Sequence, residues 1–248
     1  MIPIPFKVVY YLLYIIFLML HRVTFAAHKL AHPCVRNRTS KRLFTNGCET
    51  CLSSHSDKAL NDIRQTLSLS LDFITEEEEK ALVSTITPYF RRLRYQKDHW
   101  DSAIVGYRET EIAHTSWPEN CRPVIHRILE SSGLISKGTA LPHSHVLDLE
   151  ADGHIKPHVD SVRFCGDLIA GVSLLTDAIM RFIHTTDASR SCDVLLKRRS
   201  LYVMSGSCRY DYTHEILPSG SLFKDLPIEK GRRLVVICRS KPSHEKLT

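Results

Sequence analysis

The chain has 248 residues, a mass of 28.4 kDa and a formal net charge of +6. This length fits one domain of ordinary size with an extension, and it allows a large buried core. A hydrophobic content of 43% and a charged content of 24% are ordinary for a globular protein, and no long repeat or low-complexity block is present. Composition therefore excludes a repeat or low-complexity protein, and it names no function.

The positive charge is concentrated near the N-terminus. Residues 1–48 contain seven basic residues and no acidic ones, which leaves 26 basic against 27 acidic residues in the rest of the chain. Non-specific binding to nucleic acid needs several Lys or Arg side chains that neutralise phosphates. The chain after residue 48 is nearly neutral and gives no general support for such binding. A local basic patch on that part of the chain remains an alternative.

The N-terminal segment carries two conflicting targeting signals. Val8–Leu20 is entirely apolar or aromatic, too short for a membrane span but suited to a secretory signal with Ala26 and Ala27 at its cleavage site. The basic, acid-free stretch His28–Cys48 is typical of a mitochondrial transit peptide. Secretion and mitochondrial import both remain alternatives. We assign residues 1–66 to a targeting or disordered segment.

Eight cysteines are scattered along the chain, which is too long to need disulfide staples, so we expect mostly free thiols. Cys48 and Cys51 form a lone CxxC motif. A zinc site would need a second pair of ligands, and only His55 lies near. We favour exposed thiols over a zinc site.

Two amphipathic helices are predicted in the first half of a domain that starts near Leu67. Thr75–Glu78 fits a capping box, and apolar residues at helical spacing follow it as far as Phe90. We interpret the four glutamates at 76–79 as a solvated first turn that complements the helix dipole, not as a metal site. The second helix is expected between Pro118 and Ser132.

The segment Arg91–Arg108 mixes basic and aromatic residues. This composition is typical of a surface that binds single-stranded nucleic acid. A basic helix end followed by a half-buried strand explains it equally well.

Short strands separated by turn residues dominate the chain after Gly138. They predict an α+β fold that is mainly β, a double-stranded β-helix (jelly roll) with the N-terminal helices packed on one face, over residues 67–240. Residues 241–248 are expected to be a C-terminal tail. The predicted strands are His143–Leu149, Ile155–Asp160, Leu168–Leu175, Ile179–His184, Val194–Leu196, Leu201–Met204, His214–Leu217 and Leu234–Cys238.

His158 and Asp160 are candidates for a metal site. Alternate residues of a strand share a face, so both side chains can point at one spot while Val159 packs behind them. His214 from a distant strand would complete two histidines and one carboxylate, the facial triad that holds non-haem Fe(II). A His-x-Asp pair alone is weak, and an exposed polar strand face remains an alternative. His143 and His145 also alternate, but no third ligand accompanies them, which favours a polar strand face near the pocket rim.

The strand around Val235 is apolar on both faces and should be buried. Period two places Arg233 and Arg239 on the same face, and buried guanidinium groups require anionic partners. A dicarboxylate cosubstrate would satisfy them, since guanidinium groups bind carboxylates bidentately. Structural salt bridges to Asp or Glu are the alternative.

These residues resemble the AlkB branch of the 2-oxoglutarate- and Fe(II)-dependent dioxygenases, and within it a mitochondrial subfamily. The resemblance covers about residues 67–240. Beyond the triad and the two arginines, it rests on these segments: Asp98–Asp101, Gly106–Glu111, His145–Glu150, Gly153–Ser161, Phe164–Gly166, Ser200–Tyr202 and Gly231–Ser240.

The resemblance implies that His158, Asp160 and His214 bind Fe(II) and that Arg233 and Arg239 hold 2-oxoglutarate. It further implies that Tyr202 places a hydroxyl on the cosubstrate and that Leu147 lies beside the pocket. Oxidative decarboxylation by O2 would yield succinate and CO2 and oxidise a C–H bond of a substrate. The strand with His145, Leu147 and Leu149 lacks the Asn and Tyr that repair-type AlkB enzymes have there, which changes the expected pocket geometry.

The substrate is predicted from the region before the iron strand. Repair-type enzymes clasp a flipped base with a lid located there. Here Trp100–Ser144 is interpreted as mostly helix with short connectors, so duplex DNA is not expected, a protein side chain is favoured and mitochondrial RNA is the alternative. A catalytically silent interaction protein is the alternative to an enzyme.

The remaining expectations concern the state of the mature protein. We expect a monomer located in the mitochondrial matrix, without stable membrane insertion. The resemblance implies a link to programmed necrosis and fatty acid metabolism.

Overall fold

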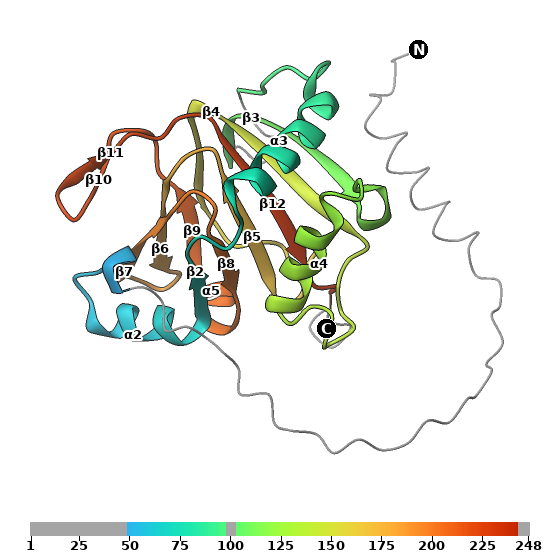
Figure 1. Ribbon diagram of the computed structural model, residues 1–248. Helices are drawn as coiled ribbons and strands as arrows, with labels where there is room; N and C mark the ends of the chain where they lie inside the picture. Colours follow the sequence, from blue (N-terminus) through green and yellow to red (C-terminus); the bar gives the residue numbers. More distant parts are fainter. Residues whose placement is uncertain (1–48, 98–102, 243–248) are drawn as a thin grey trace, which may run out of the picture. The chain divides into compact units, whose positions relative to one another are not determined.

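The computed structural model of this protein describes residues 49–97 and 103–242. Ten strands form one curled antiparallel sheet in the order β1-β7-β6-β9-β4-β12-β5-β8-β2, with β3 paired to β4 (Figure 1). The strands are β1 (Leu52–Ser53), β2 (Leu67–Ser70), β3 (Ile104–Ala113), β4 (His143–His158), β5 (Ile169–Leu174), β6 (Ala178–His184), β7 (Asp187–Leu196), β8 (Leu201–Met204), β9 (Tyr212–Ile216) and β12 (Arg233–Arg239). The predicted jelly roll is confirmed. A separate hairpin of β10 (Ser221–Phe223) and β11 (Leu226–Ile228) projects from the body.

The helices are short and lie mainly in the first half of the chain. They are η1 (Glu49–Cys51), α2 (Asp57–Thr66), α3 (Glu76–Phe90), η2 (His114–Ser116), α4 (Arg122–Ser131) and α5 (Gly206–Tyr210). The capping box of α3 is confirmed, because the Thr75 hydroxyl accepts from the Glu78 amide and the Glu78 carboxylate accepts from the Thr75 amide. In Figure 1, α3 and α4 lie over the face of the sheet at β12 and β5, as predicted.

Glu79 departs from the predicted solvated first turn. Its side chain is buried, accepts from the Leu175 amide at 2.7 Å and pairs with the Arg198 guanidinium at 2.7 Å. Glu76 and Glu77 are exposed as predicted. The α3 turn is therefore anchored to a distant part of the chain by one of its four glutamates.

The folded region begins upstream of Leu67. Helix α2 buries Ala59 and Ile63 in the main hydrophobic core. The Asp62 carboxylate accepts from the hydroxyl of Tyr212 on β9 at 2.9 Å, which ties the helix to the sheet. An amphipathic helix of ten residues thus belongs to the domain, because its apolar face packs on the barrel.

The predicted secondary structure of Trp100–Ser144, mostly helix with short connectors, is wrong, since the region contains the ten-residue strand β3. This strand pairs with β4 over most of its length, from Ile104 opposite Ile155 to Ala113 opposite His143. Trp100 itself lies outside the described residues. Strand β4 is longer than expected, because its 16 residues join two predicted strands into one that pairs with β12 at one end and β9 at the other.

The two faces of the sheet bury two hydrophobic clusters. Leu147, Leu149 and Val235 point into the barrel, whereas Val146 and Val236 point towards α3 and α4. Five described cysteines are free thiols, as predicted: Cys121, Cys165, Cys192, Cys208 and Cys238. Cys51 is 3% exposed, so the predicted exposed thiol is wrong at that position. No helix in the described part of the chain is long and apolar enough to cross a membrane, and Val8–Leu20 and Cys48 lie outside it.

Candidate active site

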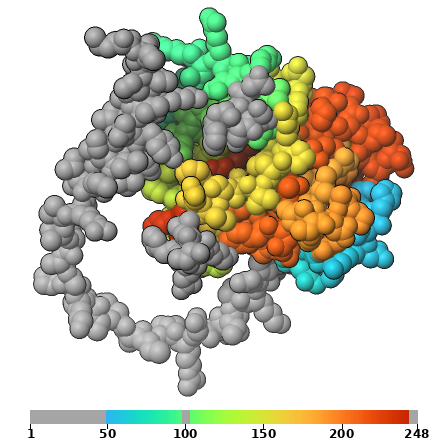
Figure 2. Space-filling model, turned by 180° about the vertical axis from the view of Figure 1, so that it is seen from behind, coloured from blue at the N-terminus to red at the C-terminus, as the bar shows by residue number. Residues whose placement is uncertain are grey.

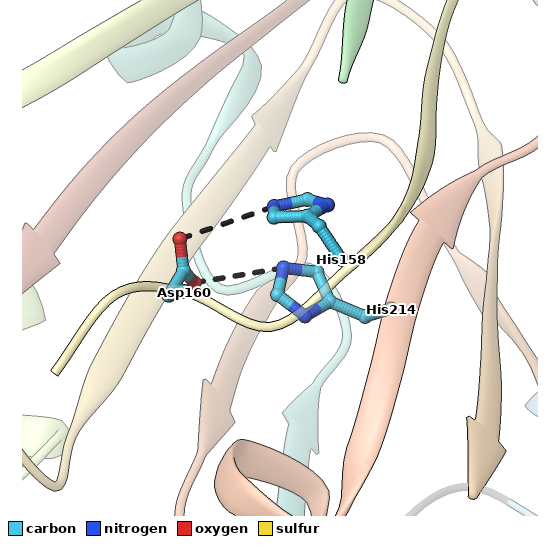
Figure 3. A group of neighbouring side chains, drawn as sticks. All are labelled: His158, Asp160 and His214. Carbon is cyan, nitrogen blue, oxygen red and sulfur yellow. Dashed lines mark ion pairs between the residues drawn. The ribbon is translucent and has the colours of Figure 1, made fainter. Parts of the chain in front are cut away.

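His158, Asp160 and His214 come together at one end of the barrel (Figure 3). The Asp160 carboxylate lies 3.9 Å from His158 Nε2 and 3.6 Å from His214 Nε2, and the centroids of the two imidazole rings are 4.3 Å apart. One ligand atom from each residue lies within 4.8 Å of the others. Two imidazole nitrogens and one carboxylate oxygen are a donor set that suits non-haem Fe(II).

Local backbone structure places each member of this triad. His158 is the last residue of β4 and is paired directly with His214 on β9, after a register irregularity that follows Ile155. Asp160 follows the strand instead of continuing it, and Val159 is 36% exposed, so the predicted packing of Val159 behind the pair is wrong. The irregular pairing and the strand end bring all three side chains to one point.

Hydrogen bonding orients the first histidine. His158 Nδ1 donates to the carbonyl oxygen of Lys156 at 2.9 Å. A carbonyl can only accept, so the proton is on Nδ1 and Nε2 keeps a free lone pair that faces Asp160. An imidazole held in this tautomer is ready to act as a metal ligand.

The electrostatics of the triad favour the protonation states that bind metal. Burial acts to raise the pKa of Asp160, but the charges of His214, Arg239, His158 and Arg209 outweigh it and lower the pKa to about 2. Burial lowers the pKa of His214 to about 4, although the Asp160 charge opposes this. At neutral pH, Asp160 is ionised and His214 is neutral, as metal coordination requires.

A second group of polar residues lies on the inner face of β12 and its neighbours. Arg233 is 1% exposed, and its Nη2 donates to the Ser173 hydroxyl at 3.1 Å. Burial raises the pKa of Tyr202, and its side chain also hydrogen bonds with Arg233, which partly offsets that rise. The register of β12 against β4 confirms that Arg233 and Arg239 share a face, with Val235 between them opposite Leu147.

The two inner-face arginines have unused donors. Arg233 Nε and Arg239 Nε are buried without hydrogen-bond partners, and neither guanidinium forms an ion pair among the described residues. Structural salt bridges, the alternative interpretation of this pair, are therefore not found in the described part of the chain. A buried cation with unused donors fits a ligand that brings carboxylates.

Ser173, Gly171 and Arg209 were missed in the sequence. Ser173 and Gly171 interrupt an otherwise apolar strand at alternate positions, a signal of close approach that could have been used. A Cβ at Gly171 would overlap the Tyr202 ring, so only glycine leaves room for it there. Arg209 carries no sequence signal, because its contacts are with residues more than 40 positions away.

His143 and His145 pair with glutamates across the sheet. His145 Nε2 lies 2.9 Å from Glu109 Oε2, and His143 Nε2 lies 3.2 Å from Glu111 Oε1. These pairs belong to the β3–β4 ladder, on the face that carries Leu147. They form a polar strand face and not a metal site, in agreement with the interpretation from sequence.

The site is open to the surface. Figure 2 shows a recess between the green segment of β3 and the yellow segment that includes the end of β4, with the dark red of β12 in it. The side chains of His158 and Asp160 are 27% and 19% exposed. Two of the three triad side chains are therefore partly exposed.

Comparisons with known proteins agree with this geometry. The model of the 2OG-Fe(II) oxygenase superfamily matches residues 54–239. This chain is similar to two proteins that carry the name alpha-ketoglutarate-dependent dioxygenase alkB homolog 7, mitochondrial. The Bos taurus protein is 46% identical over 171 residues, covering 68% of this chain and 76% of its own length. The Mus musculus protein is 41% identical over 206 residues, covering 83% and 91%.

Solved structures support the fold. A Pseudomonas putida prolyl-4-hydroxylase superposes with a TM-score of 0.52 at 13% identity, covering 75% of this chain and 98% of its own. The structure titled OsALKBH1 gives a TM-score of 0.53 at 10% identity, covering 71% and 98%. The chain therefore belongs to the 2OG-Fe(II) oxygenase superfamily, as an AlkB-type dioxygenase similar to alkB homolog 7.

Proposed function

We propose that His158, Asp160 and His214 bind the Fe(II) of this dioxygenase and that Arg233 binds the distal carboxylate of 2-oxoglutarate. Arg239 assists near the metal, Tyr202 donates its hydroxyl to the cosubstrate, and Leu147 forms a wall of its pocket. The observation that carries the proposal is a metal-binding triad at one end of a barrel whose inner face holds a buried, unpaired Arg233.

The family uses Fe(II) and 2-oxoglutarate. When bound, iron together with O2 supplies the oxidative decarboxylation of 2-oxoglutarate to succinate and CO2, coupled to oxidation of a substrate C–H bond. The protein contributes position, charge and exclusion of water. His158, Asp160 and His214 would hold the metal, which would supply the reaction of the 2-oxoacid with O2 beside the open side of the triad.

The chain's own residues divide this work. His214 is buried and neutral, Asp160 is ionised, and His158 is held by the Lys156 carbonyl, so metal binding requires no proton release from His214 near neutral pH. Arg233 is buried at the start of β12 next to the hydroxyls of Ser173 and Tyr202, and a charge-assisted bond to a carboxylate is strong in such a buried place. Gly171 keeps Tyr202 within reach of Arg233.

A protein side chain is the proposed substrate class. The described residues between 103 and 143 fold as β3, η2 and α4 against the sheet, with no hairpin that could clasp a flipped base. The turn after the triad exposes apolar side chains, with Val162 36% and Phe164 57% exposed. Exposed apolar residues beside an open site favour contact with a polypeptide.

RNA is the second candidate. The segment after α3 exposes Arg91, Arg92 and Arg94, and none of them forms an ion pair within the described residues. Unpaired arginines of this kind can neutralise phosphates. The near-neutral charge of the chain after residue 48 is the reason for ranking RNA below protein.

We further propose that the protein acts as a monomer in the mitochondrial matrix. Both relatives carry the word mitochondrial in their names. The basic, acid-free stretch before residue 49 supports the same address, although it lies outside the described residues. A role in programmed necrosis or fatty acid metabolism, implied by the resemblance, would follow from that location.

Succinate release from 2-oxoglutarate with Fe(II), ascorbate and O2 tests the proposal. We expect turnover by the wild-type protein and its loss in His158→Ala and Arg233→Ala. Equal turnover by wild type and both variants would contradict the site, and no iron-dependent turnover would support an interaction protein instead. Mitochondrial protein extract and mitochondrial RNA are then added in separate assays. The one that stimulates succinate release identifies the substrate class.

A further inference from the structure

Arg209 is a fully buried guanidinium next to the candidate iron site. Its side chain is 1% exposed and comes from α5, five residues before His214. Nε donates to the Gly166 carbonyl at 3.2 Å, and Nη2 donates to the carbonyl and the thiol of Cys165 at 3.3 Å each. All of these contacts are with the turn that follows Asp160.

The charge of Arg209 has no structural counter-ion of its own. It forms no ion pair in the described part of the chain, and Nη1 is buried without a hydrogen-bond partner. A buried charge of this kind normally pairs with a carboxylate. The guanidinium is instead held by two carbonyl groups and a thiol of the turn that follows Asp160.

Helix α5 is fixed at its other end. The Cys208 amide donates to the Thr66 hydroxyl at 3.2 Å, and the Ser205 amide donates to the Thr66 carbonyl at 2.9 Å. The next residue after Arg209, Tyr210, donates its hydroxyl to the Asp167 carboxylate. The helix therefore connects α2, the Asp160 turn and the strand that begins just before His214.

We propose that Arg209 is a positioning residue for the iron site, which holds the turn after Asp160 at a fixed place relative to His214. This inference rests on the proposed function, because it takes the triad as the metal site. Arg209 acts through Asp160, so it sets metal affinity without touching the substrate. Loss of such a supporting partner lowers metal affinity by roughly 10- to 100-fold.

Metal binding to the full-length protein tests this role, with Mn(II) as the probe in place of oxidisable Fe(II). The Arg209→Met variant removes the charge and all three hydrogen bonds, and we expect its Mn(II) dissociation constant to rise about 10- to 100-fold. Arg209→Lys keeps the charge but loses the planar fork, and we expect a rise of about threefold to tenfold. Tyr210→Phe is the matched control, and its Mn(II) affinity should stay within about twofold of wild type.

Unfolding of the metal-free variants separates support of the fold from support of the metal. If Arg209 had only a structural role, its replacement would lower the melting temperature and leave the Mn(II) affinity of the folded protein unchanged. That result for Arg209→Met overturns the inference, and if Arg209→Met fails to fold, wild-type affinity of Arg209→Lys overturns it. An equal loss in Tyr210→Phe overturns it as well.

His158→Ala distinguishes failure of this inference from failure of the proposed function. If His158→Ala loses Mn(II) binding and Arg209→Met does not, the triad stands and Arg209 has only a structural role. If His158→Ala binds Mn(II) like wild type, the triad is not the metal site and both proposals fail.

Discussion

Arg232 immediately precedes β12 and Arg233 is its first residue, but their side chains lie on opposite faces of the sheet. On the outer face, Arg232 binds the buried Asp148 carboxylate through Nε at 2.9 Å and Nη2 at 3.0 Å. Arg108 Nε and the Tyr95 hydroxyl donate to the same carboxylate at 2.7 and 3.1 Å. Every charge in this outer group has its partner within the protein.

On the inner face, Arg233 has only hydroxyl partners, Ser173 and Tyr202, and its Nε has none. Burial lowers the pKa of Arg233. Two arginines adjacent in sequence therefore differ in whether the described part of the protein supplies a carboxylate partner. Arg232 is partly exposed and paired, whereas Arg233 is buried without a carboxylate partner among the described residues, the arrangement expected where a ligand brings the anion.

The largest expected effect is on the outer face. Asp148→Ala removes the carboxylate shared by Arg108, Arg232 and Tyr95, and we expect the free energy of unfolding to fall by about 3–5 kcal/mol. Urea denaturation of the metal-free protein measures this change. Glu76→Ala, which breaks an exposed pair with Lys80, should leave the unfolding midpoint nearly unchanged, and an equally small effect of Asp148→Ala would contradict the closed outer group.

The inner face should respond in the opposite way. Arg233→Met removes an unpaired buried charge, so we expect stability without ligand to stay equal or rise, while 2-oxoglutarate binding weakens by about 2–5 kcal/mol. Calorimetric titration of the Mn(II)-loaded protein measures the affinity. In Arg232→Met we expect the reverse, a loss of stability with normal affinity. If both variants lose only stability, the two faces do not differ.

The inner face should also make stability depend on pH. His214 has a folded pKa of about 4 against an ordinary value of 6.5, so between these values the unfolded chain binds a proton that the folded protein does not. Stability of the metal-free protein should fall as pH drops from 6.5 to 4, by at most about 3 kcal/mol. Asp160, with a folded pKa of about 2 against 3.8, adds a loss only below pH 3.8.

Denaturation in EDTA at several pH values checks this dependence. His214→Gln should flatten the slope between pH 4 and 6.5, whereas His126→Gln, which replaces a largely exposed imidazole, should not. A slope that persists in His214→Gln would assign the pH dependence to another group.

The smallest expected effect comes from Gly171. Gly171→Ala places a methyl group where the Tyr202 ring lies, and we expect a loss of about 1–3 kcal/mol in stability together with weaker 2-oxoglutarate binding. Gly231→Ala is the control, because its added Cβ would meet only Thr176 at ordinary contact distance. Normal 2-oxoglutarate affinity in Gly171→Ala would show that Tyr202 does not contribute to the pocket.

The features that could be predicted from sequence depend on local rules. Period two along β12 places Arg233 and Arg239 on one face, and the register confirms it. The capping box at Thr75 needs only residues three positions apart. The triad needed the family resemblance as well, because spacing alone does not connect His158 with His214.

The features that were missed depend on contacts between distant residues. Asp152 and Gly153 suggested a break in β4, but pairing with two different strands keeps it continuous. The charged Glu109 and Glu111 made β3 difficult to identify, since their histidine partners are adjacent only in the folded sheet. Glu79 was assigned to solvent because its partner Arg198 is 119 positions away.

Helix α2 sets a limit on proteolytic maturation. Residues Leu52 and Ser53 pair with β7, and Thr66 at the end of α2 holds the helix that carries Arg209. A protease that removes an N-terminal leader would have to cut before Leu52 to leave both β1 and α2 in the product. A cut within α2 would leave the triad residues in the chain but remove the support behind them.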